Sequence, residues 1–421
     1  GEGPGLAGER GIAAQRLDHR RPLPEADDRE EVRGQEVRED GRVVARLAHT
    51  ETGVQGPTLT FGRMLTPVDA VALPDVFPDG SPELAVLGDT DDGRVVGVLI
   101  KETGSGATVG RFRLSPSYQP LDPAELAALA RRQSLLADLT HRERPRLSLA
   151  GAQDKLPVRY DADGSLWLPV GGAPSTHLLK VPSRDYRHLP ANEVATTQLA
   201  ARLGLPTVEA HLLVLDDVEV ALLPRYDRKR TAAGIDRLHQ EDLCQARGLM
   251  PSTKYEQEGG PGFQDAMEVV RARSTEPLQD TLSLIRWLAF VLLVGNADAH
   301  GKNLSLLYGD RPAEGPRLAP SYDLVCTRVY PRLARHLAMA VGGSRDPGQI
   351  AGGHWKALAA EIGVGMRLVL AEVQRLAKAM PETFNQVIEA QRTAHGPSPV
   401  LERIRGQLRK QSRRTKQLLS E

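Results

Sequence analysis

The stretch LIRWLAFVLLVGNADAHGKNLSLLY, residues 284–308, joins two apolar segments through one short polar loop. The first apolar run stops at Gly295. Four polar residues then fall within six positions: Asp298, His300, Lys302 and Asn303. Burying such groups without partners costs free energy. We therefore expect a buried helix, then a loop that faces water, internal partners or a ligand, and then a hydrophobic strand.

Bulk composition limits the class of protein. The chain has 421 residues, 40% of them hydrophobic, which is enough for a large core and for two or three domain-sized units. The 54 basic and 54 acidic residues balance, so charge alone gives no reason to expect nucleic-acid or membrane binding. Cys244 and Cys326 form no disulfide or metal pattern, which favours a reducing compartment.

The sequence also bears on the location of the protein. The N-terminus lacks the apolar core of a signal peptide, and the longest apolar run, Trp287 to Val294, is too short to span a bilayer. We therefore expect a soluble, cytoplasmic protein.

The order of expected elements is that of an α+β protein. We expect residues 1–40 to be weakly ordered and residues 41–120 to form a small β-rich subdomain. Residues 121–235 combine an amphipathic helix at 122–140, strands, and a second helix that ends at Gly204. Residues 236–421 are mostly helical, with two strands around 303–324. A β-rich lobe followed by a helical lobe predicts a ligand in the cleft between them.

Four helices are expected near the C-terminal end of the chain. Their predicted ranges are 354–362, 364–379, 382–393 and about 399–419. The last is strongly basic, and a solvated helix explains it more simply than an interaction tail.

Asp298 and Asn303 have the spacing Asp-x-x-x-x-Asn, and Asp323 follows the predicted hairpin. Phosphoryl transfer needs a carboxylate that orients or deprotonates the attacking hydroxyl, and oxygen ligands that hold Mg²⁺. The hairpin folds the chain back, so that Asp323 can approach Asn303. His300 and Lys302 could stabilise charge on the phosphates. The spacing alone is a weak signal, and the alternative is a polar loop in which Asp298 caps a turn.

Two further segments favour a nucleotide site. Lys180 ends the apolar strand THLLK, and Glu193 lies in the first turn of the next helix, the arrangement with which kinases hold α and β phosphates. The alternative is an edge-strand lysine that points to water. In LSLAGAQDKLPV, small residues around Gly151 would let backbone N–H groups approach phosphate oxygens, and Lys155 adds charge. In isolation, a plain turn explains that loop equally well. A polar block at 237–263 is expected to have a structural or cleft-lining role.

Taken together, these segments resemble the HipA family of serine/threonine kinases, the toxins of bacterial toxin–antitoxin pairs. The matching segments run in order over residues 120–395: RLSLAGAQDK, THLLK, NEVATTQLAARLGL, PRYDR, HQEDLCQARGL, KYEQEGGPGF, GNADAHGKNLSLL, PSYDL and HWKALAAEIG. The resemblance implies a two-lobed, protein-kinase-like fold that uses ATP and Mg²⁺. It makes residues 121–235 the ATP-binding lobe and residues 236–421 the catalytic lobe.

The resemblance also implies a role for each matching residue. Asp298 matches the catalytic aspartate, and Asn303 and Asp323 match the metal ligands. Further residues match positions near the nucleotide: Ala150, Gly151, Ala152, Gln153, Asp154 and Lys155 of the phosphate loop; Lys180 with Glu193; Pro224, Arg225 and Tyr226 of the adenine hinge; and His300, Gly301, Lys302 and Tyr322. Ser148 matches the autophosphorylation site.

Two departures limit the resemblance. Pro224 stands where family members often have glutamate, and proline lacks the backbone N–H, which puts one adenine contact in doubt. Residues 1–115 lack the usual N-terminal signatures, so antitoxin contacts of that region are not carried over.

The function implied is an ATP-dependent serine/threonine protein kinase that phosphorylates a cellular protein and itself. Substrates in the family are aminoacyl-tRNA synthetases, often the glutamyl enzyme, and the partner is a small DNA-binding, HipB-like antitoxin that provides the only link to DNA. One alternative is an inactive relic that only joins an antitoxin–operator complex. Another is a kinase of a lipid or small molecule. The complete set Lys180, Asp298, Asn303 and Asp323 favours catalysis over the relic.

Overall fold

The computed structural model describes residues 33–39, 42–49, 58–61, 71–72, 82–88, 95–102, 108–113, 117–132, 155–170, 173–183, 185–232, 234–309 and 315–420. The chain divides into two compact units. The first holds residues 1–122, 134–148 and 159–173, and the second holds residues 123–133, 149–158 and 174–421.

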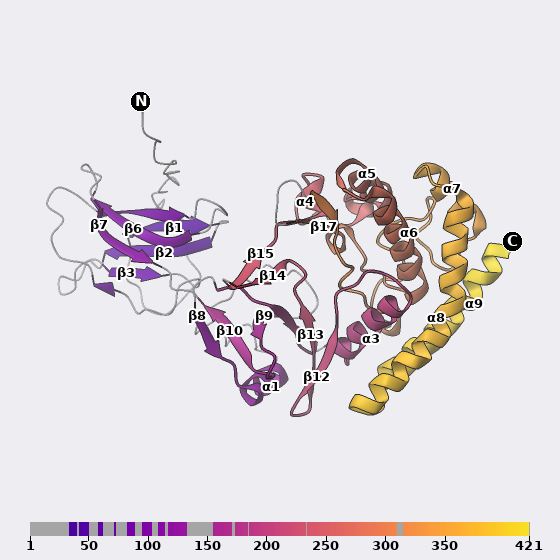
Figure 1. Ribbon diagram of the computed structural model, residues 1–421, viewed down its shortest axis with the longest axis horizontal. Coiled ribbons are helices and arrows are strands. Elements are labelled where there is room, and N and C mark those ends of the chain that lie inside the picture. Colours follow the sequence, from indigo (N-terminus) through magenta and orange to yellow (C-terminus); the bar gives the residue numbers. More distant parts are fainter. Residues whose placement is uncertain are drawn as a thin grey trace. The chain divides into compact units, whose positions relative to one another are not determined.

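The first unit is built from antiparallel strands (Figure 1). One sheet has the order β1 (Arg33–Glu39), β2 (Arg42–His49), β3 (Thr58–Phe61) and β4 (Val71–Ala72), and a second has β5 (Pro82–Gly88), β6 (Val95–Glu102) and β7 (Thr108–Arg113). β8 (Ser117–Pro120) pairs with β10 (Leu166–Val170). The strands predicted within 41–115 are confirmed. β1 lies inside the segment that was predicted to be weakly ordered.

The second unit begins with a β-rich lobe. Its strands have the order β12 (His211–Leu215), β13 (Val218–Pro224), β11 (His177–Lys180) and β9 (Lys155–Tyr160), all antiparallel. α1 (Pro123–Arg132) and α3 (Leu189–Arg202) pack against β12 and β13. α3 has Pro190 in its first turn, where a missing N–H costs nothing, and is followed by Gly204 at φ +83°. The predicted strands and the predicted helix that ends near Gly204 are confirmed, although α3 begins at Leu189, so that Glu193 lies beyond its first turn. Of the helix predicted at 122–140, α1 covers Pro123–Arg132, and residues 133–140 lie outside the described residues.

The helical lobe is organised around α6 (Pro277–Val294). From Leu284 to Val294, all residues of α6 but Arg286 are buried, because their side chains are apolar around the whole helix. α6 is long and apolar enough to cross a membrane by length and composition, but 67% of it is buried inside the protein, as in a core helix. α5 (Phe263–Arg273), α8 (Met366–His395) and α9 (Pro399–Ser420) pack against it.

Smaller elements complete this lobe. A three-stranded sheet has the order β16 (Gln240–Asp242), β17 (Ser305–Tyr308) and β18 (Pro316–Leu318), and β14 (Arg228–Thr231) pairs with β15 (Gly234–Arg237). The short helices are α4 (Leu243–Ala246), α7 (Gly352–Glu361), and 3-10 turns at Glu256–Glu258, Gly301–Asn303 and Thr327–Val329.

The prediction of separate helices at 364–379 and 382–393 is wrong, because α8 runs unbroken from Met366 to His395 with Pro381 inside it. A proline there removes one backbone hydrogen bond and crowds the preceding turn. On both sides of Pro381, however, side chains of the same face are buried, among them Met380 and Phe384. Packing of that face overrides the local preference to break.

Candidate active site

The loop after α6 leaves the helix at Gly295, which has φ +74°. A Cβ at this position would lie 2.3 Å from Cγ of Arg328, so both the backbone conformation and the space require glycine. The Thr327 hydroxyl donates to the Gly295 carbonyl at 2.9 Å and accepts from the backbone N–H of Ala297 at 2.9 Å. The loop is therefore fixed to the segment that follows Asp323.

Asp298 presents its carboxylate at the surface of this loop, with 63% of the side chain exposed. Its backbone N–H donates to Oδ1 of Asn296 at 3.1 Å, and its own Oδ1 accepts from the hydroxyl of Tyr255 at 2.5 Å. Nε2 of His300 lies 4.0 Å from the same oxygen. The carboxylate is thus oriented through one oxygen, while its exposure leaves it open to a substrate.

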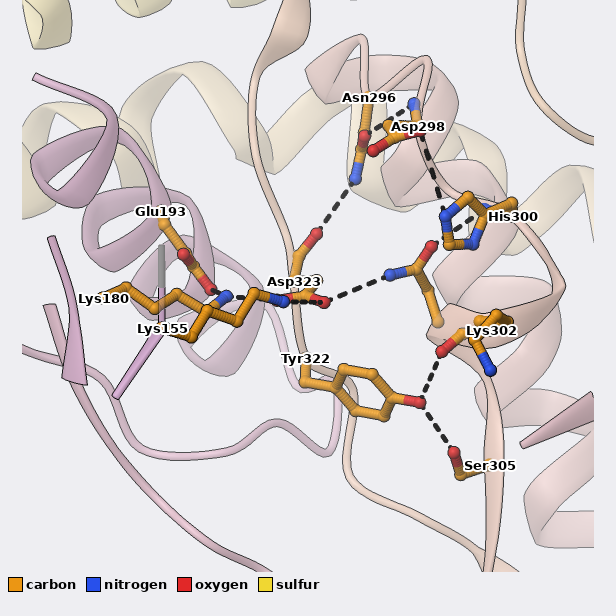
Figure 2. Close-up of polar contacts among 11 residues, drawn as sticks. Lys155, Lys180, Glu193, Asn296, Asp298, His300, Lys302, Ser305, Tyr322 and Asp323 are labelled. Carbon is orange, nitrogen blue, oxygen red and sulfur yellow. Dashed lines mark hydrogen bonds and ion pairs between the residues drawn. The ribbon is translucent and has the colours of Figure 1, made fainter. Parts of the chain in front are cut away.

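Asn303 and Asn296 connect the loop to Asp323 (Figure 2). Nδ2 of Asn303 donates to Oδ2 of Asp323 at 3.4 Å, and Oδ1 of Asn303 accepts from the backbone N–H of His300 at 3.0 Å. Nδ2 of Asn296 donates to the backbone carbonyl of Asp323 at 3.3 Å. The predicted approach of Asp323 to Asn303 therefore occurs.

Lys180 and Glu193 form the predicted strand–helix ion pair, and both are buried, with 4% and 0% of the side chain exposed. Lys180 also contacts Oδ1 of Asp323, while Nζ of Lys155 lies 3.4 Å from Oδ2 of the same carboxylate. Lys155 and Lys180 are direct partners on neighbouring strands β9 and β11. Two like charges placed opposite each other repel, and Asp323 between them offsets that repulsion (Figure 2).

The charges of this cluster depend on each other. Burial opposes the positive charge of Lys180, but the carboxylates of Asp323 and Glu193 outweigh it and raise the pKa of the amine. Burial likewise opposes the charge of Asp323, yet Lys180 and Lys155 hold its pKa well below the ordinary value. For Glu193 burial prevails over Lys180 and raises the pKa. Its second carboxyl oxygen has no hydrogen-bond partner within the described part of the chain.

These side chains line one cavity of about 490 Å³. Its wall brings together residues predicted from separate parts of the sequence: Lys155, Lys180, Glu193, Asp298, His300, Asn303 and Asp323. Burial lowers the pKa of His300, which favours a neutral ring in spite of the nearby Asp298. The cavity therefore combines a cationic end, at the two lysines, with an exposed carboxylate.

Three predicted nucleotide residues instead support the loop. Lys302 is paired with Asp242, and the hydroxyl of Tyr322 donates to the Lys302 carbonyl at 2.8 Å. Gly301 is buried, and a Cβ there would lie 2.4 Å from Cγ of Pro261. Burial raises the pKa of Tyr322 well above its usual value, so the phenol stays a hydrogen-bond donor. None of the three lines the cavity.

The predicted hinge residues also lie off the cavity wall. Pro224 ends β13, and the backbone N–H of Arg225 donates to the Thr176 carbonyl at 2.9 Å. The ring of Tyr226 stacks on that of Tyr322, with centroids 5.6 Å apart. An adenine contact at the hinge stays a prediction. Ser148 and residues 150–154 of the predicted phosphate loop lie outside the described residues.

Two residues of the site were not predicted. Asn296 joins the Asp298 loop to Asp323, and Tyr255 binds the Asp298 carboxylate from 43 positions earlier in the chain. Tyr255 belongs to the polar block at 237–263, for which a cleft-lining role was one expectation, but no spacing rule linked it to Asp298. No pattern in the sequence predicted the close packing of Gly301 on Pro261 either.

The oxygen donors present suit a magnesium ion. Among the described residues there is no cluster of three or more His, Cys, Asp or Glu side chains that could hold a metal ion. Mg²⁺ uses one or two carboxylates together with amide oxygens, water and substrate phosphates. Asp323 and Asn303 both line the cavity and carry a carboxylate and an amide oxygen, which are donors of this kind, although in this structure the amide nitrogen of Asn303 faces Asp323 and its oxygen accepts the N–H of His300.

A buried lysine–glutamate pair, an exposed loop aspartate and an Asn–Asp pair around one cleft define a protein-kinase-like site on a two-lobed fold. The chain belongs to the family described as "HipA-like C-terminal domain", whose model matches residues 147–388.

Individual relatives agree with this family. A Sinorhizobium fredii protein named as a candidate kinase, Y4mE, is 41% identical over 64% of this chain. The serine/threonine-protein kinase toxin HipA of Shewanella oneidensis is 32% identical over 58% of it. The chain spans 64% and 58% of the lengths of these two relatives. The solved Shewanella oneidensis HipA, from a complex with HipB and operator DNA, has a similar fold, with a TM-score of 0.64 and 22% identity; the match covers 90% of this chain and 97% of that one.

Proposed function

We propose that this chain is an ATP-dependent serine/threonine protein kinase of the HipA toxin type. The observation that carries the proposal is the convergence of Lys180, Asp298 and Asp323, from three distant segments, on one cavity. Lys180 and Lys155 would bind phosphate oxygens, and Asn303 with Asp323 would hold Mg²⁺, which neutralises charge on the triphosphate. Asp298 would accept the proton of the substrate hydroxyl as its oxygen attacks the γ-phosphorus, while the bond from that phosphorus to the β,γ-bridging oxygen breaks and ADP leaves.

The experiment compares wild type with Asp298→Gln. We expect transfer of γ-phosphate to protein to fall at least about 1000-fold, because general-base and orienting contributions are of that order. Radiolabelled ATP measures transfer, and circular dichroism checks the fold. Asp236→Asn removes an exposed carboxylate on β15 and is the matched control. Wild-type turnover in Asp298→Gln would rule out the assigned role.

The finer parts of the proposal follow family resemblance. They are phosphorylation of Ser148 by the kinase itself, an aminoacyl-tRNA synthetase as substrate, a HipB-like antitoxin as partner and a cytoplasmic location. The complex in which the Shewanella relative was solved supports the antitoxin. Mass spectrometry of wild type after incubation with ATP should find phosphate on Ser148, and its absence there would count against autophosphorylation at this serine.

A further inference from the structure

The cavity is also lined by residues to which phosphate transfer assigns no role, and this set is called the second wall. This wall is part apolar and part basic: Tyr186, Leu189, Lys254, Gln257, Val325, Leu333, Ala334, His336, Leu337, Ala338 and Arg345. Among the described residues that line the cavity, the carboxylates are those of Glu193, Asp298 and Asp323 alone. The second wall itself therefore carries no acidic side chain.

Lys254 is a basic residue of this wall that lies against Tyr255, the residue that binds the Asp298 carboxylate. Its backbone carbonyl accepts the N–H of Gly301 at 3.1 Å, and its Nζ lies 5.0 Å from the centroid of the Tyr255 ring. That ring belongs to the phenol that binds Asp298. Within the described residues, no carboxylate lies within ion-pair distance of Lys254, so its charge is not neutralised there.

Arg345 is held at the wall by polar contacts that leave its charge unbalanced. Its guanidinium donates to the side-chain carbonyl of Gln257, and its backbone carbonyl accepts the N–H of Leu337 at 2.8 Å. No described carboxylate forms an ion pair with it. Glu256 is an electrostatic neighbour of Arg345 beyond ion-pair distance, and its carboxyl accepts the Ala340 N–H at 2.5 Å.

Unbalanced cations that face a cleft favour an anionic ligand, and an apolar wall beside them favours an apolar side chain. We propose that this wall is the acceptor subsite and that it binds a peptide segment in which the serine or threonine is flanked by an acidic residue and an apolar residue. The inference rests on the proposed kinase function. Lys254 and Arg345 would bind the acidic side chain, and Leu189, Val325 and Leu337 would contact the apolar one.

The experiment uses the full chain and a peptide array with one serine, in which each flanking position is fixed in turn as Glu, Gln or Lys. We expect Glu to be preferred over Lys at one or more positions by about tenfold in kcat/KM, a modest value because exposed charge pairs are weak. Arg345→Glu should reverse that ratio toward Lys, and Lys254→Ala should reduce it.

The control variant is the double substitution Arg367→Ala and Lys378→Ala, which removes two exposed cations from α8, neither of which lines the cavity. It should keep the wild-type preference. Phosphorylation of the array without any preference for Glu, or an unchanged ratio in Arg345→Glu, would overturn the inference and leave the kinase function standing. If the Lys254 and Arg345 variants had a higher KM for ATP but an unchanged preference for Glu over Lys peptides, the two cations would bind the nucleotide instead. No transfer to any peptide or to the protein itself would contradict the proposed function.

Discussion

Asp323 occupies a backbone conformation that few residues other than glycine adopt, with φ +55°. Non-glycine residues in the left-handed region cost free energy, and such residues are frequent at functional sites. Here the conformation places one carboxylate between Lys155, Lys180 and the amide of Asn303.

Tyr255→Phe should lower kcat about tenfold, since loss of one hydrogen bond to a charged group corresponds to about one factor of ten in rate. The ring stays, so its edge-to-face contact with His300, at 5.1 Å, should persist. KM for ATP should not change. Steady-state phosphate transfer measures both constants.

Tyr308→Phe is the matched control for this prediction. It also removes a phenol that donates to a carboxylate, that of Glu241 at 2.9 Å, and neither residue lines the cavity. Equal kcat in wild type and Tyr255→Phe would show that the phenol does not position Asp298.

Lys180→Met should destabilise the protein by about 3 kcal/mol, because it leaves the buried Glu193 carboxyl without its partner. The double variant Lys180→Met, Glu193→Leu should recover part of this loss, because the Glu193 carboxyl is then gone and only Asp323 still lacks its contact with Lys180. Urea unfolding of the single and double variants gives the coupling free energy. ATP binding should be lost in both variants that lack Lys180.

An exposed pair provides the comparison for that coupling. Arg392 and Glu389 on α8 lie 2.8 Å apart and are about 60% exposed. Their coupling should stay below about 0.5 kcal/mol, since exposed pairs are screened by water. Additive effects at Lys180 and Glu193 would mean that the buried pair contributes nothing to the fold.

At the scale of elements, Pro381 lies inside α8, where its ring disfavours the helical conformation. Pro381→Ala should raise the free energy of unfolding by about 2 kcal/mol, because alanine restores a backbone donor and removes the clash with the preceding turn. Urea unfolding measures this change, and Gln374→Ala, an exposed substitution in the same helix, is the control. A loss of stability would indicate that the pyrrolidine ring itself packs favourably.

The elements that sequence predicts well are those whose signals are local. These signals include the apolar run of α6, its stop at Gly295 and the alternating strands. Each is contained in a few residues, so the position of the loop with Asp298 and Asn303 was predicted correctly. The two halves of α8 were separated because packing against α6 and α9 is not visible in a single segment. Tyr255 was missed for the same reason, since only the folded chain brings it to Asp298.

At the scale of the molecule, the cavity wall is shared by the β-rich and helical lobes of the second unit. Lys155 and Lys180 come from β9 and β11, while Asp298 and Asn303 follow α6. A ligand that bridges these residues links both lobes and should stabilise them together. The linkage follows from mass action, because the unfolded chain has no such site.

A non-hydrolysable ATP analogue with Mg²⁺ should therefore raise the melting temperature. At about 100 times Kd the gain is about 2.7 kcal/mol, and at about 2–4 °C per kcal/mol for a domain of this size the melting temperature should rise by about 5–11 °C. Removal of Mg²⁺ with a chelator should abolish most of the shift, since Asn303 and Asp323 hold the metal in the proposed site. In Asp323→Asn, the analogue should raise the melting temperature only slightly, and equally with and without Mg²⁺. Asp236→Asn should show the same shift of the melting temperature as wild type. A full shift in the presence of the chelator would contradict the metal role of Asp323, and no shift with any nucleotide would contradict the ATP site itself.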